Sequence, residues 1–232
     1  MQSNYFGTFV RKAHSLTAMA DFYVNSQSNR VGETPEEIID FSYRHGPVIP
    51  RQVRSEVLRF ARLVHNCAPK TVVEIGTHAG GTFFVLCRCA DPEATVISID
   101  LPGARFSGGR PKFVERLLPR MPLGTQKFHC LRADSHEHSS LNWLEATLQG
   151  RQVDVMLIDG DHTYEGVKKD FAMYSPLVRK GGIVAFHDIV RHPRDPGCEV
   201  EVFWKEIKLR YKHEELIEDP QQGWAGIGVL YL

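Results

Sequence analysis

The 232-residue sequence has neither a long hydrophobic run nor a run of like charge. No apolar stretch approaches the roughly 20 residues that a membrane-spanning helix needs. The first residues, MQSNYFGTFVRK, lack the apolar core of a signal peptide. The 28 lysines and arginines are balanced by 28 acidic residues, so no excess of positive charge favours nucleic acid. We therefore expect a soluble protein with no nucleic-acid or membrane partner.

Cysteine is also scarce. The five cysteines are Cys67, Cys87, Cys89, Cys130 and Cys198, and no two of them form a C-x-x-C pair. An odd set without paired spacing indicates neither a disulfide framework nor a structural zinc site. We expect reduced, mostly buried thiols, which is typical of a cytoplasmic protein.

Short β-rich runs alternate with helical patterns from about residue 70 onward. This alternation predicts an α/β fold with a mostly parallel sheet covered by helices on both faces. The length suits one large domain, or one domain with an N-terminal extension. The expected strands are residues 71–75, 95–100, 127–131, 153–159, 183–186, 213–217 and 225–232.

Several helices are indicated by apolar residues that recur at the helical period. Pro111 lies where a first helical residue is expected, a position at which proline is tolerated. Gly181 and Gly182 are expected to end the helix that precedes them. The apolar stripes cover residues 53–64, 111–118, 167–177 and 200–211.

The N-terminal part of the chain differs from the rest. Residues 34–37 read T-P-E-E, a capping box with proline at the first helical position, which predicts a helix through Ile38, Ile39 and Phe41. We expect residues 1–49 to form an N-terminal helical arm and residues 50–232 to form the main domain. The arm either packs on this domain or on another subunit, which favours a homo-oligomer, or it covers a substrate as a lid.

A glycine-rich turn follows the first expected strand, in the sequence VVEIGTHAGGT at residues 72–82. Gly76 allows a sharp turn, and Gly80 and Gly81 allow the backbone to approach a ligand closely. The second strand ends at Asp100, 24 residues after Gly76 (100 − 76). A carboxylate at that place can accept hydrogen bonds from both hydroxyls of an adenosine ribose.

The same turn departs from the patterns that bind pyrophosphate. It reads G-x-x-x-G-G rather than G-x-G-x-x-G, and no lysine follows to form a phosphate loop. Glu74, just before the turn, suits a ligand with an ammonium and a sulfonium group better than a pyrophosphate. Asp134 and Ser135 close the third strand, and they suit either an adenine amino group or a plain turn.

Acids and histidines follow the fourth and fifth expected strands, as I-D-G-D-H at 158–162 and F-H-D at 186–188. The ends of neighbouring parallel strands lie side by side, so Asp159, His187 and Asp188 can converge on one divalent cation. Two carboxylates suit Mg²⁺, and the imidazole shifts the preference towards Mn²⁺. Such an ion lowers the pKa of a hydroxyl that it binds.

His162 is the expected general base, because its ordinary pKa of about 6.5 lies close to the working pH. Asp161 either orients His162 or replaces it as the base. A single histidine at a strand end is more often structural, but here two histidines and three acids share adjacent strand ends. His136 and His138 lack such company, and we expect them to be solvated turn residues.

Residues 74–188, together with GWAGIGVL at 223–230, resemble class I S-adenosylmethionine-dependent methyltransferases. More narrowly, the chain is similar to the group of cephalosporin hydroxylases and rhamnosyl O-methyltransferases, which are related to macrolide-sugar O-methyltransferases. The resemblance covers most of the chain, including residues 50–56. It rests on the combination of E-x-G-x-x-x-G, I-D-G-D-H and F-H-D.

This resemblance implies a Rossmann-like sheet of seven strands whose last strand is antiparallel. It implies S-adenosylmethionine as the cofactor, with Asp100 on the ribose. It also implies metal-binding roles for Asp159 and Asp188 and a base role for His162. The macrolide-sugar relatives have a second acid where this chain has His187, so the set of donors differs here.

The expected site falls into three groups. The cofactor-binding residues are Glu74, Gly76, Thr77, Gly80, Thr82, Asp100, Asp134 and Ser135. The metal ligands are Asp159, His187 and Asp188, and the catalytic residues are His162 and Asp161.

We hypothesise an O-methyltransferase that moves a methyl group from S-adenosylmethionine to a hydroxyl of a sugar or another small metabolite, assisted by a divalent cation such as Mg²⁺ or Mn²⁺. One alternative is an NAD-dependent oxidoreductase, which normally has the tighter glycine pattern. Another is a non-catalytic, S-adenosylmethionine-binding subunit of an oxygenase. Acceptor specificity is expected in the arm and in loops 103–110 and 192–198, which carry no recognisable code.

Overall fold

The computed structural model describes residues 20, 22, 24–26, 31–45, 48–102 and 112–232, with residues 112–114 described by their backbone alone. The first nineteen residues of the expected arm, the loop 103–110 and Pro111 lie outside the described residues.

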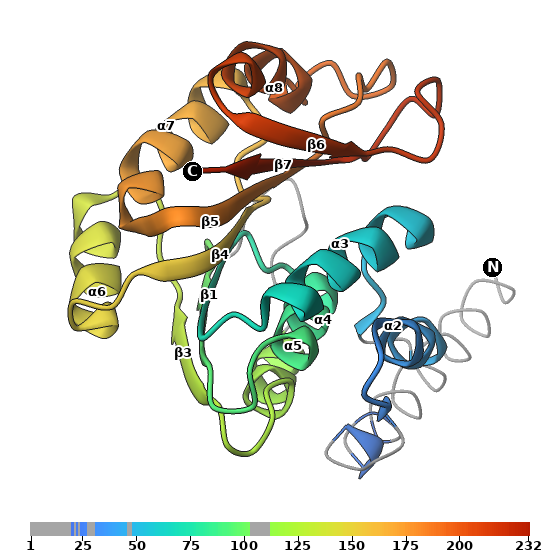
Figure 1. Ribbon diagram of the computed structural model, residues 1–232, viewed down its shortest axis with the longest axis vertical. Helices are drawn as coiled ribbons and strands as arrows, with labels where there is room; N and C mark the ends of the chain where they lie inside the picture. The colour runs from blue at the N-terminus through green and yellow to red at the C-terminus, as the bar shows by residue number, and fades with distance from the viewer. Residues whose placement is uncertain (1–19, 21, 23, 27–30, 46–47, 103–111) are drawn as a thin grey trace, which may run out of the picture.

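A seven-stranded sheet runs through the centre of the molecule (Figure 1). Its strand order is β3-β2-β1-β4-β5-β7-β6, and β7 runs antiparallel to both of its neighbours, whereas the other pairs are parallel. The predicted Rossmann-like sheet with an antiparallel last strand is therefore confirmed. The strands are β1 (Thr71–Ile75), β2 (Thr95–Ile99), β3 (Lys127–Leu131), β4 (Val153–Ile158), β5 (Val178–His187), β6 (Lys212–Leu216) and β7 (Ile227–Tyr231).

Helices cover both faces of this sheet (Figure 1). The described helices are α2 (Pro35–Arg44), α3 (Arg54–Cys67), α4 (Gly81–Cys89), α5 (Lys112–Leu117), α6 (His138–Leu148), α7 (Tyr164–Tyr174) and α8 (Val200–Ile207). Alternate residues of each strand serve opposite faces. In β1, Val72 packs in one hydrophobic core with α2, α3 and α4, whereas Val73 packs in a second core with α6, α7 and α8.

The helix before β5 ends earlier than expected. α7 ends at Tyr174 and is followed by a short 3-10 turn, Ser175–Leu177, which contains Pro176. Gly181 and Gly182 lie inside β5, so the prediction that they end the helix is wrong. Gly181 has a φ of 73° and donates its N–H to the carbonyl of Leu232. The pairing register with β4 shifts in this part of β5, so the glycines belong to an irregular part of the strand.

The described part of the N-terminal region packs on the main domain. Thr34 and Glu37 form the predicted capping box, with the Thr34 hydroxyl accepting the Glu37 N–H. Ile38, Ile39 and Phe41 are buried, and the Phe41 ring stacks on Phe84 of α4 with centroids 5.6 Å apart. Helix α2 is therefore part of the first hydrophobic core.

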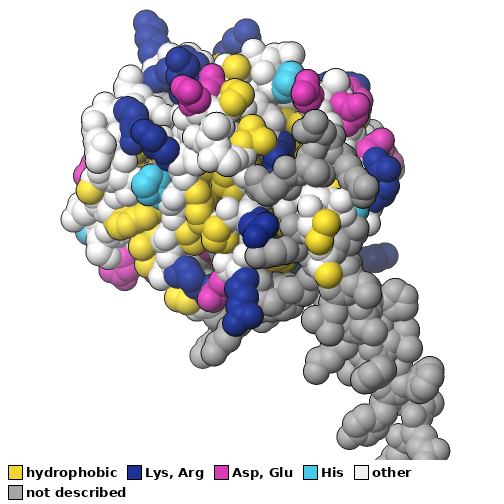
Figure 2. Space-filling view, turned by 90° about the horizontal axis from the view of Figure 1, so that it is seen from below, with side chains coloured by type: hydrophobic (Ala, Val, Ile, Leu, Met, Phe, Trp, Pro, Cys, Tyr) yellow, Lys and Arg dark blue, Asp and Glu magenta, His cyan; other side chains and the backbone are white. Residues whose placement is uncertain are grey.

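The surface carries both signs of charge. On the face shown in Figure 2, lysine and arginine side chains are interspersed with acidic ones rather than gathered in one patch. Among the described helices, none is both long enough and apolar enough to cross a membrane.

Candidate functional site

The glycine-rich turn lies between the ends of β2 and β4. The Gly76 N–H donates to the Ile99 carbonyl at 2.8 Å, and the Asp159 N–H donates to the Ile75 carbonyl at the same distance. These bonds extend the parallel ladders by one residue on each side. The carboxyl ends of β1, β2 and β4 therefore meet at one edge of the sheet.

The glycines of this turn are required by packing against protein. Gly76 has a φ of 86°, and a Cβ atom there would collide with the Asp159 carbonyl. Gly80 has a φ of 84°, and a Cβ atom there would lie 2.6 Å from the Met121 side chain. A Cβ atom on Gly81 would lie 2.6 Å from the Pro50 backbone nitrogen. Close approach to the backbone thus accounts for Gly76 and Gly81, and the positive φ accounts for Gly80. Their contact with a ligand stays a prediction.

Asp100 lies beside the turn, as predicted. Its Oδ1 atom accepts the His78 backbone N–H at 3.3 Å. Thr77 and Ser98 of β2 share a buried hydroxyl–hydroxyl bond of 2.7 Å, which ties the turn to the neighbouring strand. Glu74 is buried within β1, and Thr82 is buried in the first turn of α4. The turn is thus fixed by β2, with the Asp100 carboxylate next to it.

Asp134 and Ser135 form a turn after β3. The Asp134 Oδ1 atom accepts the His136 N–H at 2.9 Å, and the Ser135 carbonyl accepts the Tyr174 hydroxyl at 2.5 Å. The structure thus gives Asp134 the turn role that the sequence left open. An additional contact of this turn with adenine stays a prediction.

His136 is not the solvated turn residue that the sequence predicted. Its ring lies against α7, with Nε2 at 3.4 Å from Asp170 Oδ1 and 3.2 Å from the Gly166 carbonyl. The ion pair with Asp170, whose side chain is 0% exposed, outweighs burial and raises the pKa of His136. His138 is exposed, as expected, but it begins helix α6 rather than lying in a turn.

The predicted metal ligands come together at the ends of β4 and β5. One ligand atom from each of Asp159, His187 and Asp188 lies within 4.8 Å of the other two. His187 Nδ1 is 3.3 Å from Asp159 Oδ1 and 3.3 Å from Asp188 Oδ1. His187 and Asp188 are buried, and Asp188 has a left-handed backbone φ of 63°.

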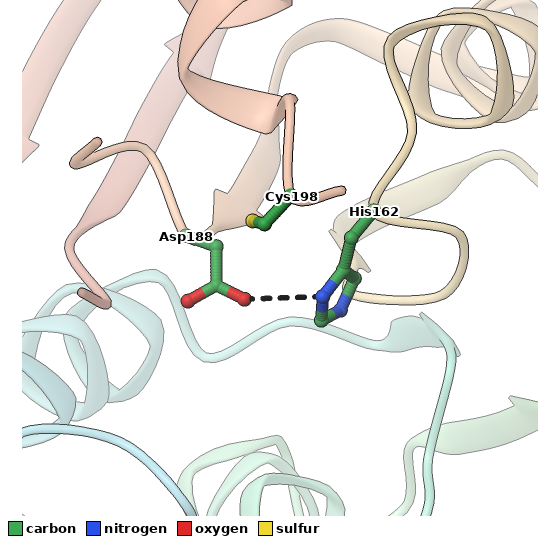
Figure 3. Close-up of side chains that lie close together, drawn as sticks. All are labelled: His162, Asp188 and Cys198. Atoms are coloured by element: carbon green, nitrogen blue, oxygen red, sulfur yellow. Dashed lines mark ion pairs between the residues drawn. The ribbon is translucent and has the colours of Figure 1, made fainter. Parts of the chain in front are cut away.

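His162 lies next to this cluster. Its Nε2 is 3.4 Å from Asp159 Oδ1, and its Nδ1 is 3.4 Å from Asp188 Oδ2. Figure 3 shows the ion pair with Asp188 and the Cys198 side chain beside it. Asp161 is exposed and accepts the Thr163 N–H at 2.9 Å. The carboxylates that face His162 are thus Asp159 and Asp188, and a catalytic role for Asp161 stays a prediction.

The two histidines of the cluster are held in their protonated form. Burial alone lowers the pKa of an imidazole, but the neighbouring carboxylates outweigh it and raise the pKa of His162 to about 11 and that of His187 to about 10. Burial likewise opposes the ionised form of Asp159 and Asp188, yet the histidines lower the pKa of both acids. Two imidazolium groups thus balance two carboxylates.

These donors fit a divalent cation. Two carboxylates and one imidazole, with one atom of each close to the others, form a set that Mn²⁺ accepts and that Mg²⁺ tolerates. A cation and the two imidazolium protons are alternative ways to balance the same carboxylate charge. Such an ion is therefore suited to the donor set of Asp159, His187 and Asp188.

Three residues near the cluster were not singled out from the sequence. His192 Nε2 lies 3.0 Å from Asp188 Oδ1 and accepts the Ala225 N–H at 3.0 Å. Gln52 Nε2 lies 3.5 Å from Asp159 Oδ2. Cys198 joins His162 and Asp188 in a second group of close donors. The sequence carries no signal for them beyond the place of His192 and Cys198 at the two ends of the loop 192–198 in which acceptor specificity is expected.

Comparison with known families gives a match over the core of the sheet. The family described as "Methyltransferase domain" matches residues 73–189, a range that contains every predicted site residue. This range covers 117 of the 232 residues (189 − 73 + 1).

Two curated proteins are similar to the chain over part of their length. The uncharacterized protein y4gI of Sinorhizobium fredii (strain NBRC 101917 / NGR234) is 27% identical over 149 residues, which are 62% of this chain and 16% of that protein. The uncharacterized protein R132 of Acanthamoeba polyphaga mimivirus is 27% identical over 118 residues, 51% of each chain. The match thus spans about half, or less, of these relatives.

Solved structures share the fold at low sequence identity. An O-methyltransferase from Bacillus cereus in complex with SAH has a TM-score of 0.59 and 16% identity, over 85% of this chain and 90% of that one. The O-methyltransferase TomG from Streptomyces achromogenes, involved in tomaymycin synthesis and in complex with SAM, has a TM-score of 0.55 and 16% identity, over 84% of this chain and 86% of that one.

Proposed function

Because the chain belongs to the methyltransferase domain family, we propose that it is an S-adenosylmethionine-dependent O-methyltransferase acting on a hydroxyl of a small molecule, with a sugar as the favoured class. The single observation that carries the proposal is the placement of two groups at one edge of the sheet. Asp100 lies against the glycine-rich turn, and the acid–histidine cluster lies at the adjoining ends of β4 and β5.

This placement indicates which residues would lie at each part of the cofactor and which would lie at the acceptor. Asp100 would accept hydrogen bonds from the ribose hydroxyls, and the Asp134–Ser135 turn would lie at the adenine. Glu74 and the turn at Gly76, Thr77, Gly80 and Thr82 would border the methionine part. The acceptor hydroxyl would then lie at the cluster of Asp159, His187 and Asp188.

The chain's own residues would carry the proton transfer. His162 would accept the proton of the acceptor hydroxyl as that oxygen takes the methyl group, and S-adenosylhomocysteine would leave. A divalent cation held by Asp159, His187 and Asp188 would supply acidity to the acceptor hydroxyl. His162 must be neutral to accept a proton. The charge of the carboxylates that raise its pKa therefore has to be balanced in another way.

Calorimetry with S-adenosylmethionine and S-adenosylhomocysteine tests the cofactor. We expect binding of both, and weaker binding by an Asp100→Ala variant. Turnover is then followed as formation of S-adenosylhomocysteine with a panel of sugars, phenols and other hydroxyl acceptors. Failure of both nucleosides to bind at high concentration would end the proposal. Binding without turnover on any acceptor would favour the accessory-subunit alternative.

The cation is tested separately from the cofactor. Asp159→Ala and Asp188→Ala are expected to abolish Mn²⁺ binding in calorimetry and to remove turnover, and a chelator should act in the same way. Glu145→Ala changes an exposed acid on α6 and serves as the control. Full turnover of both cluster variants, with no effect of the chelator, would remove the cation from the reaction. Membership of a methyltransferase family gives no support to the nicotinamide alternative.

A further inference from the structure

The acid–histidine cluster has a second group of donors, in which Cys198, which the proposed function does not use, joins His162 and Asp188. His162, Asp188 and Cys198 each offer one ligand atom within 4.8 Å of the other two. The three side chains come from separate places, the loop after β4, the end of β5 and the residues before α8 (Figure 3). Nitrogen, oxygen and sulfur donors thus meet at one point.

The Asp188 carboxylate presents a different oxygen to each side. Its Oδ1 atom faces His187 at 3.3 Å and His192 at 3.0 Å, whereas its Oδ2 atom faces His162 Nδ1 at 3.4 Å. A cation beside His162 and Cys198 would use Oδ2. It would therefore be distinct from a cation held through Oδ1 with Asp159 and His187.

The backbone holds Cys198 in place beside His162. The N–H of Glu199 donates to the His162 carbonyl at 2.7 Å, and the Glu199 carboxylate accepts the Tyr164 N–H at 3.0 Å. The Cys198 N–H in turn donates to the Asp195 carbonyl at 3.0 Å. The segment that carries the thiol is thus bonded to the segment that carries the imidazole, so the donors are arranged before any ion binds.

The chemistry of these donors selects the ion. Thiolate sulfur and imidazole nitrogen are ligands of Zn²⁺ and similar ions, whereas Mg²⁺ prefers oxygen. The His162 side chain is 41% exposed, so the point is open to solvent, and three protein ligands leave a position for water. We propose that Cys198, His162 and Asp188 form a second cation site that is selective for zinc-like ions.

Binding at this site has a consequence for the reaction, and that consequence rests on the proposed function. An ion on His162 Nδ1 would occupy the imidazole that the proposal uses as a base. Zinc-like ions would then inhibit methyl transfer, whereas Mg²⁺ would not. The existence of the site itself does not depend on methyl transfer.

Cobalt(II) is the probe for the test, because a Co²⁺–thiolate bond gives an intense charge-transfer absorption band. The full chain is freed of metal with a chelator, kept reduced under inert gas and titrated with Co²⁺. We expect the band in the wild-type protein, its removal by Zn²⁺ and its persistence in excess Mg²⁺. Absence of the band in the wild-type protein would overturn the proposal.

Variants identify the ligands. Cys198→Ser and Cys198→Ala are expected to lack the band, and His162→Gln is expected to bind Co²⁺ at least about tenfold more weakly. Cys67→Ser removes the exposed thiol at the end of α3 and should keep the band. Asp159→Asn should also keep it, because Asp159 is not one of the three ligands and the asparagine oxygen can still accept the His162 Nε2–H.

Two results would contradict the site. A band that persists in both Cys198 variants would place the sulfur ligand elsewhere, and a band lost in Asp159→Asn would make Asp159 part of the same site, so that the two cation sites are not separate. Circular dichroism of each variant confirms that it is folded. No methyl donor takes part, so the outcome stands whether or not S-adenosylmethionine binds.

Discussion

Asp188 has a backbone conformation that residues other than glycine rarely adopt. Its φ of 63° costs of the order of 1–3 kcal/mol for such a residue, and it follows directly on the last residue of β5. The next two residues are held to the β7 side, with Ile189 N–H donating to the Gly226 carbonyl and Val190 N–H to the Ala225 carbonyl. The turn directs the Asp188 carboxylate among three histidines, His162, His187 and His192.

The base can be identified at a single residue. His162→Gln keeps a polar side chain of similar length but cannot accept a proton at neutral pH, so the rate should fall by about 10²–10⁴. Asp161→Asn should retain most of the rate, because its carboxylate caps the Thr163 N–H. Both rates are measured as formation of S-adenosylhomocysteine with a saturating acceptor. The opposite order of the two variants would assign the base role to Asp161.

The His136–Asp170 pair predicts a pH dependence of stability. The pKa of His136 is raised in the folded state, so the folded protein binds a proton between pH 6.5 and this raised value that the unfolded chain does not bind. The stabilisation is complete below about pH 6.5 and is lost as the pH rises through the folded value. Asp170→Asn removes the acid that causes the shift.

The test of this pair compares free energies of unfolding. Urea denaturation of the wild type and of Asp170→Asn is carried out at pH 6.0 and at pH 9.0. We expect Asp170→Asn to lose more free energy of unfolding at the lower pH. His138→Gln, which removes an exposed histidine two residues from His136, should show no such difference. A loss that is equal at both pH values would mean that the pair does not stabilise the fold through protonation.

At the level of elements, the strands were predictable because buried parallel strands are continuous apolar runs bounded by turn residues. The predicted run at 153–159 became β4, Val153–Ile158, one residue shorter. Helix α6 was not predicted. It has no side-chain cap at Glu137, and only Ser140, Leu144 and Leu148 are buried, so its apolar stripe is sparse. Local sequence patterns therefore predict the strands better than they predict this helix.

The candidate site was predictable only where the sheet determines it. Asp159 and Asp188 follow directly on two paired parallel strands and His187 ends one of them, so their closeness follows from the strand order. His192 and Cys198 lie in a loop whose position depends on bonds to distant segments, such as Glu199 N–H to the His162 carbonyl. No spacing in the sequence encodes those bonds. The expectation of mostly buried thiols is wrong, because only Cys87 and Cys89 of the five cysteines are buried.

Glu56 of α3 links a third element to the site. Its side chain is 0% exposed and accepts the N–H groups of Glu218 and Gly226 and the amide of Gln222. Gly226 follows Ala225, whose N–H is bonded to His192. A buried carboxylate on α3 thus holds the β6–β7 loop that contacts the cluster.

Glu56→Ala is expected to lower the free energy of unfolding by about 2–4 kcal/mol, because three donors lose a charged acceptor inside the protein. Urea denaturation measures the loss. Glu145→Ala, an exposed acid on α6, should change it by less than about 0.5 kcal/mol. A similarly small loss for Glu56→Ala would show that water replaces the carboxylate and that the loop does not depend on it.

On the scale of the whole molecule, the strand order determines where a ligand is bound. From β1 the sheet grows in one direction through β2 and β3, and in the other through β4 and β5. In open α/β sheets the crevice at such a reversal, outside the carboxyl ends of the strands, is the usual binding place. The Gly76 turn follows β1 and Asp159 follows β4, so both borders of this reversal carry predicted site residues.

A ligand at this reversal should stabilise the whole fold. At S-adenosylhomocysteine concentrations of about 100 times its Kd, binding adds about 2.7 kcal/mol to the free energy of unfolding. For a domain of this size each kcal/mol raises Tm by about 2–4 °C, so the expected rise is about 5–10 °C. Asp100→Asn loses charge-assisted bonds to the ribose worth about 2 kcal/mol, so at the same concentration it should gain less than about 1 kcal/mol and rise by at most about 4 °C. Glu93→Gln, an exposed acid before β2, should show the full rise when Tm is measured by differential scanning calorimetry. An equal rise in Asp100→Asn and the wild type would place the nucleoside away from Asp100.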